Sequence, residues 1–202
     1  MKFPIFASFI IFVLVFTRAI RRQGRKQESR EKSFWEKERQ ANATRRKPLD
    51  DLDYIRIPLE SFPTDLMPSD ETVAECIRIL NTLSQQKIVN FTGLTNTDLK
   101  LEYGAANLDI LADYDQNYTL LVRTLQKWAD RLWEAGYREE ALPLMEFAVE
   151  THTDISQTYY KLAEAYRDRG ETSRIRALAD TAQTLRSANR NVIVRTLQES
   201  YL

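Results

Sequence analysis

The residues able to do chemistry are few and lie far apart in the sequence. The chain has one cysteine, Cys76, and one histidine, His152. Cys76 falls on the apolar face of a predicted helix, so we interpret it as a buried apolar residue rather than a nucleophile. His152 is interpreted as a helix-end or linker residue. Glu139 and Glu140 open a predicted helix, where the helix dipole favours carboxylates without catalysis.

The sequence also lacks the common motifs of enzymes. It contains no glycine-rich phosphate loop, no H-E-x-x-H, no paired cysteine ligands and no G-x-S-x-G. We therefore predict that the protein is not an enzyme, with no catalytic residues, no cofactor and no metal.

Residues 113–117 begin like a calcium-binding loop, because Asp113, Asp115 and Asn117 match the pattern D-x-D-x-N. Such a loop needs glycine at its sixth position and a bidentate carboxylate at its twelfth, where this chain has Tyr118 and Thr124. We therefore interpret residues 113–117 as a turn that ends one helix, with Asn117 capping the next.

The formal net charge of zero conceals two oppositely charged parts. Residues 18–47 hold 12 Lys/Arg and 4 Asp/Glu, a net charge of +8, whereas residues 48–202 hold 16 and 25, a net charge of −9. Charge separated in this way favours oriented association with a charged partner. The single cysteine excludes an intramolecular disulfide framework and suits a reducing compartment.

A transmembrane anchor is predicted at residues 1–20, where Phe3 to Phe16 reads FPIFASFIIFVLVF. A helix continued to Ile20 would span about 27 Å of a hydrocarbon core of about 30 Å. By the positive-inside rule, the basic residues that follow would keep the body of the chain in the cytoplasm and the N-terminus outside. These membrane-proximal basic residues are Arg18, Arg21, Arg22, Arg25 and Lys26.

The alternative for this segment is a cleaved secretory signal. Such a signal needs positive charge before the apolar run and small residues at a cleavage site. Only Lys2 precedes the run here, and residues 17–21 contain no A-x-A pattern. We therefore expect a single-pass protein of the cell membrane with an uncleaved anchor.

Residues 21–47 form a basic juxtamembrane stalk of mixed charge, in which only Phe34 and Trp35 could anchor an apolar face. A solvated helical spacer is one interpretation. The other places the arginines at an anionic leaflet, with Trp35 at the level of the headgroups.

Residues 48–68 change character, with four prolines in 21 residues and no helical period. We predict an extended Pro-rich arm. Its alternating residues Ile55, Ile57 and Leu59 would lie along the helical part of the chain and cover its core. The arm could instead occupy a groove of the same chain as an autoinhibitor.

Residues 69–202 have the pattern of an α-helical domain. Ser69 or Asp70 can cap a first helix, whose apolar face carries Val73, Cys76, Ile77, Leu80 and Leu83. A second helix is predicted at about residues 98–113, as an irregular hairpin with the first.

The later part of this domain repeats itself with a shift of 34 residues. The shift places Gly136 on Gly170 and Ala129 on Ala163. Glycine can take the left-handed conformation that ends a helix, and alanine lets two helix axes approach closely. The repeats span about 122–155 and 156–189, followed by a C-terminal capping helix at 190–202.

This repeat resembles the tetratricopeptide repeat, a 34-residue helix–turn–helix unit that stacks on its neighbours. The fragment Gly136-Tyr137-Arg138-Glu139-Glu140-Ala141 is its most specific part. The resemblance covers about 70 residues. Ile175 stands where the second copy would have alanine, and the family's proline after the second helix is absent from both copies.

In that family the first helix of each unit lines a concave binding face. The resemblance therefore implies that partner-binding residues come from two segments here, and that they form a groove of mixed charge with two aromatic residues. These residues are Arg123, Lys127, Asp130, Trp133, Tyr160, Lys161, Glu164 and Arg167, with Gln126, Glu134, Gln157 and Asp168 beside them.

Taken together, the sequence predicts an all-α, tetratricopeptide-like array of helical hairpins behind a single N-terminal transmembrane helix. The expected function is a membrane-tethered scaffold or adaptor that binds a protein or peptide partner and no nucleic acid. The alternative is a module that associates with anionic lipid, in which the helical body is purely structural.

Overall fold

The structure, a computed structural model, describes residues 12, 16–18, 27, 28 and 30–202. Every regular element in these residues is helical and none is a strand, so the all-α prediction is confirmed. The chain divides into two compact units, each described here by itself. The smaller unit holds residues 1–47 and 95–108, and the larger unit holds residues 48–94 and 109–202.

The predicted anchor at 1–20 lies outside the described residues except for Phe12 and residues 16–18. The basic residues Arg21, Arg22, Arg25 and Lys26 also lie outside them. Within the described part of the chain, no helix has the length and apolar character needed to cross a membrane. The transmembrane helix therefore stays a prediction.

The smaller unit joins part of the stalk, helical at residues 30–43, to α3 (Asn96–Tyr103) and η2 (Ala105–Asn107). Polar contacts hold it together. Lys100 Nζ lies 2.5 Å from Glu38 Oε1, and Lys37 Nζ lies 2.7 Å from Asp98 Oδ1. Donation from Lys37 and Thr95 holds the pKa of Asp98 well below its usual value.

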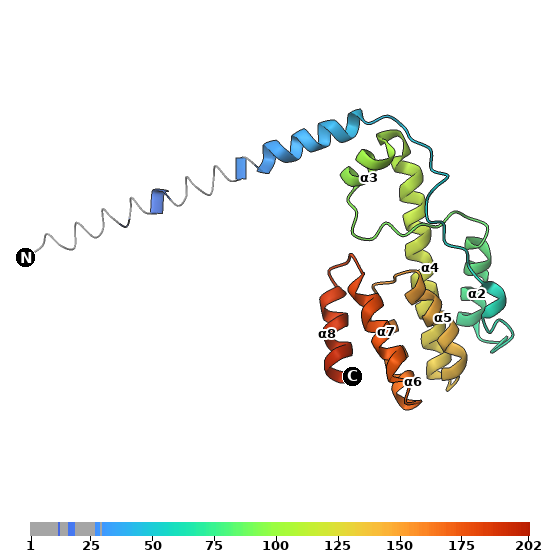
Figure 1. Cartoon of the computed structure of the whole chain (residues 1–202). Coiled ribbons are helices and arrows are strands. Elements are labelled where there is room, and N and C mark those ends of the chain that lie inside the picture. The colour runs from blue at the N-terminus through green and yellow to red at the C-terminus, as the bar shows by residue number, and fades with distance from the viewer. Residues whose placement is uncertain (1–11, 13–15, 19–26, 29) are drawn as a thin grey trace, which may run out of the picture. The chain divides into compact units, whose positions relative to one another are not determined.

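The larger unit contains η1 (Leu59–Ser61), α2 (Glu71–Leu83), α4 (Leu108–Glu134) and four more helices. These four are α5 (Arg138–Glu150), α6 (Ser156–Asp168), α7 (Thr172–Gln183) and α8 (Arg190–Ser200). Figure 1 shows α5 to α8 following one another as neighbouring antiparallel helices. Helix α8 lies within the segment 190–202 for which a capping helix was predicted, and its Ile193 and Leu197 are buried.

Helix α2 begins as the sequence predicted. Asp70 is its N-cap, and its carboxylate accepts a hydrogen bond of 3.1 Å from the amide of Val73. Val73, Cys76, Leu80 and Leu83 are buried along one face. The predicted burial of Cys76 is thus confirmed, and desolvation raises the pKa of its thiol.

The Pro-rich arm covers the core, as the first of its two interpretations predicted. Ile55, Ile57 and Leu59 pack against the core, and Phe62 is 5% exposed. The Phe62 ring meets Trp128 edge-on at 6.1 Å between centroids and lies 5.7 Å from Phe147. The arm is therefore part of the hydrophobic core.

Helix α4 overturns two predictions from the sequence. The second helix does not run through residues 98–113, because α3 ends at Gly104, whose φ is +92°. Residues 113–117 form no turn, because they lie inside the continuous helix α4. Asn117 donates to the carbonyl of Lys87 (3.0 Å), and Asp115 accepts from the amide of Phe91 (3.3 Å). These polar residues hold a loop against the helix instead of ending it.

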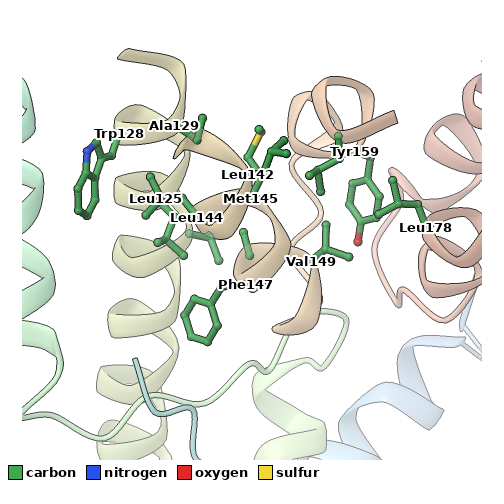
Figure 2. Packing of buried hydrophobic residues seen from close by; sticks show 14 of the residues in the cluster. Leu125, Trp128, Ala129, Leu142, Leu144, Met145, Phe147, Val149, Tyr159 and Leu178 are labelled. Carbon is green, nitrogen blue, oxygen red and sulfur yellow. The ribbon is translucent and has the colours of Figure 1, made fainter. Parts of the chain in front are cut away.

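The two helix pairs α4–α5 and α6–α7 have matching environments at positions 34 residues apart. Gly136 and Gly170 follow the first helix of each pair, with φ of +91° and +73°. Trp128 and Leu162 are both fully buried, as are Ala129 and Ala163. Figure 2 shows Leu125 and Ala129 of α4 on the side of α5, where Leu142 and Leu144 lie.

The turn between α5 and α6 accepts hydrogen bonds from side chains of α4, of α6 and of the loop between α2 and α3. The hydroxyl of Tyr118 donates to the carbonyl of Thr151 (3.0 Å), and the hydroxyl of Tyr159 donates to the carbonyl of Thr153 (3.0 Å). Asn90 also donates to Thr151 (2.9 Å). His152 occupies this turn with φ of +62°, which confirms its predicted place between helices.

Candidate functional site

An open concavity of about 470 Å³ lies between α2, α4 and the start of α6. We call it the α4 concavity, because six of its eight lining residues come from one face of α4. Its lining residues are Thr72, Arg123, Gln126, Lys127, Asp130, Arg131, Glu134 and Ile155. Three of the eight predicted partner-binding residues line it: Arg123, Lys127 and Asp130.

On the α2 side, two ion pairs join cations that line the α4 concavity to carboxylates at or near the start of α2. Arg131 Nη2 lies 2.7 Å from Asp70 Oδ2, and Lys127 Nζ lies 2.5 Å from Glu75 Oε2. The amide of Val73 and then the guanidinium of Arg131 lower the pKa of Asp70. Donation from Lys127 lowers the pKa of Glu75. Two cations of α4 are therefore neutralised by carboxylates at or near the start of α2.

On the α6 side, a connected network fixes Asp130. Lys161 Nζ lies 2.7 Å from Asp130 Oδ1, and the amide nitrogen of Gln126 donates to the same oxygen at 2.6 Å. The carbonyl oxygen of Gln126 accepts from the hydroxyl of Thr158 at 2.5 Å. The Lys161 side chain is only 14% exposed. Lys161 and Asp130 thus join two helices, and their charges neutralise each other.

The ring of Trp133 is not an exposed surface that a partner could contact freely. It is half-buried and packs against the core. Two cations lie over its ring, with Arg138 Cζ at 4.9 Å and Lys161 Nζ at 5.4 Å from the centroid. Glu164 in turn lies 3.4 Å from Arg138. Trp133 and Glu164 are therefore engaged within the chain.

Helix α8 engages the remaining predicted residues of α6. The hydroxyl of Tyr160 donates to Thr196 Oγ1 at 3.3 Å, and the Arg167 guanidinium lies 5.1 Å from the centroid of the Tyr201 ring. Tyr160 also packs against the core. The two sides of the predicted groove therefore differ. The residues from α4 line an open concavity, whereas Tyr160 and Arg167 of α6 already contact α8.

Sequence reasoning missed the contribution of α2. Thr72 lines the α4 concavity, and Asp70 and Glu75 neutralise its cations. These residues lie outside the 34-residue repeat, so the repeat carried no signal for them. Only the amphipathic pattern of α2 indicated that it would pack against another helix.

Other concavities lie in the larger unit. One of about 620 Å³ is formed by α2 and the end of the arm, and includes Met67, Ile77 and Arg78. One of about 400 Å³ lies between α7 and α8, and includes Arg190 and Arg195. Within the described part of the chain, no group of three or more His, Cys, Asp or Glu side chains is arranged to hold a metal ion.

Comparisons with known proteins add no relative. No family model matches the chain, and no curated protein or solved structure matches it. The resemblance to tetratricopeptide repeats therefore stays a prediction from the sequence.

Proposed function

We propose that this protein is a membrane-tethered scaffold or adaptor that binds a protein partner in the α4 concavity. The observation that carries the proposal is an open concavity whose lining is already ordered by Asp70–Arg131, Glu75–Lys127 and Lys161–Asp130. A surface whose side chains are already fixed loses little entropy when it binds. The lining holds no set of residues that would suggest catalysis.

We further propose that α4–α5 and α6–α7 stack as tetratricopeptide-like repeats. The same cap supports this in both pairs. The amide of Tyr137 donates to the carbonyl of Leu132 (2.9 Å), and 34 residues later the amide of Glu171 donates to the carbonyl of Tyr166 (2.8 Å). Side chains also join the first helices of the two pairs, because Lys161 of α6 pairs with Asp130 of α4 and Thr158 of α6 donates to Gln126 of α4.

The proposed tether is the apolar segment at residues 1–20, followed by basic residues that favour a cytoplasmic body. Flotation of membranes after alkaline extraction tests it. The full chain should float with the membranes, and a chain that lacks residues 1–20 should not. Equal extraction of both chains would contradict the proposed tether.

Site-specific crosslinking tests the binding surface. A photo-crosslinking residue at Lys127, inside the α4 concavity, should attach the membrane-bound full chain to a discrete partner. The matched control is Ala177, which is exposed on α7 outside the concavity. The same products from both positions would contradict a specific binding surface.

One observation favours the alternative function, association with anionic lipid. In the helical part of the stalk, Phe34 and Trp35 are 53% and 63% exposed, and their rings meet edge-on at 5.4 Å. Exposed aromatic rings beside Arg30 and Lys32 would suit a headgroup layer. Co-sedimentation with phosphatidylserine vesicles tests it. Binding that falls in a chain with Phe34→Ala and Trp35→Ala would support this function.

A further inference from the structure

Two charged residues of the α4 concavity have no partner among the residues that the structure describes. Arg123 and Glu134 are both exposed and line the concavity. Neither forms an ion pair or a side-chain hydrogen bond with another described residue. Every other charged residue of the lining is paired: Lys127 with Glu75, Arg131 with Asp70, and Asp130 with Lys161.

Arg123 and Glu134 lie at opposite ends of the α4 concavity. They are eleven positions apart on one continuous helix, and eleven residues make about three turns at 3.6 residues per turn. Their side chains therefore share one face of α4. At a rise of about 1.5 Å per residue, their Cα atoms are separated by about 16 Å along the axis.

This separation leaves the two charges independent of each other. In physiological salt, charges more than about 8 Å apart in solvent are largely screened. Arg123 and Glu134 therefore do not neutralise one another, whereas the pairs between them cancel at contact distance. The concavity presents one positive end, an internally neutral middle and one negative end.

We propose that the partner segment is an extended peptide that carries an acidic and a basic side chain about five residues apart. An extended chain advances about 3.3 Å per residue, so about five residues span 16 Å. The acidic side chain would pair with Arg123 and the basic side chain with Glu134. This inference rests on the proposed function, because it assumes that the α4 concavity binds protein.

The two end charges would also set the direction of the peptide. A peptide bound in the reverse direction would place like charges together at both ends, which disfavours that complex. The paired residues in the middle would give no preference, because their charges are already satisfied. Polarity of the bound peptide is therefore the property to test.

The experiment is selection of phage-displayed random 12-residue peptides on the full chain in detergent micelles. On the wild-type chain, enriched peptides should carry Asp or Glu and Lys or Arg four to six positions apart, in one predominant order. On the double variant Arg123→Glu with Glu134→Arg, the predominant order should invert. Each single variant should bind the best wild-type peptide about threefold to tenfold more weakly.

The matched control is the double variant Arg176→Glu with Asp180→Arg, which exchanges two exposed charges of α7 outside the α4 concavity. It should select the wild-type order. Circular dichroism should show the same helix content and melting temperature for both double variants.

Three results would overturn the proposal. The proposed direction of the bound peptide would be refuted, and peptide binding left intact, if the enriched peptides showed no charge order. The same holds if the Arg123/Glu134 exchange left their order unchanged. Absence of any enrichment over empty micelles would refute the proposed function as well. A wild-type dimer that the Arg123→Glu variant abolishes would assign the concavity to a second copy of the chain.

Discussion

The substitution Phe62→Ala tests whether the Pro-rich arm is a structural part of the larger unit. Phe62 is 5% exposed and contacts two aromatic rings that come from α4 and α5. Its removal would leave a cavity beside Trp128 and Phe147. The arm would also lose its one fully buried anchor, since Ile55 and Ile57 are only partly buried.

The expected loss in free energy of unfolding is about 3–5 kcal/mol, the usual range for a buried phenylalanine truncated to alanine. For a chain of this size, the loss corresponds to a fall in melting temperature of roughly 10 °C. Phe62→Leu keeps most of the apolar volume but loses two ring contacts, each worth about 0.5–1.5 kcal/mol. The free energy of unfolding of Phe62→Leu should therefore lie between those of Phe62→Ala and the wild type.

The assay is urea unfolding of the full chain, followed by circular dichroism at 222 nm. The control is Glu60→Ala, which changes an exposed residue of the same arm. If the free energy of unfolding of Phe62→Ala lay within about 0.5 kcal/mol of that of this control, the arm would contribute little to the core. The interpretation of the arm as a removable autoinhibitor would then regain support.

Three further predictions concern single residues. Burial raises the pKa of Tyr118 above its ordinary value near 10, so the unfolded chain loses this proton first as pH rises. Stability should therefore fall above pH 10 by about 1.4 kcal/mol per pH unit for this group, and urea unfolding at several pH values should show a shallower fall in Tyr118→Phe. The thiol of Cys76 should not react with Ellman's reagent in the folded chain but should react in urea, and rapid reaction without urea would contradict its burial. Gly136→Ala should lower the free energy of unfolding by about 1 kcal/mol, because the positive φ disfavours alanine. No further loss is expected, since the added Cβ would meet no atom within 4 Å. Gly93→Ala should cost more, because its Cβ would lie 2.5 Å from Cβ of Arg186, and equal melting temperatures for the two variants would refute this difference.

Features set by local chemistry could be predicted from the sequence. Asp70 caps α2 because an acidic side chain directly before an amphipathic run can accept from free amides at the helix start. Gly136 and Gly170 end their helices because a left-handed residue is needed there. Each of these outcomes depends on a few neighbouring residues.

The continuity of α4 could not be predicted in this way. Asp115 and Asn117 resemble turn residues, and in isolation their side chains compete with helical hydrogen bonds. In the folded chain they bind the Phe91 amide and the Lys87 carbonyl. These loop groups come from a distant part of the sequence, so the tertiary structure overrides the local preference.

The contribution of α2 to the candidate site could not be predicted for the same reason. Asp70 and Glu75 meet Arg131 and Lys127 only after two helices from different parts of the sequence have packed together. The residue types alone did not distinguish these carboxylates from the other acidic residues of the domain. Arg123, Lys127 and Asp130 could be grouped from the sequence because all three lie on one helix face, and they line the same concavity.

The turn between α5 and α6 bears on how the protein would recognise partners. Helical arrays can bend where one pair of helices joins the next. Here the carbonyls of that turn accept hydrogen bonds from the hydroxyls of Tyr118 and Tyr159 and from the side-chain amide of Asn90. We therefore expect the turn to resist hinge motion. A receptor that does not need to close would admit different ligands at similar rates, so its preferences would appear mainly as differences in residence time.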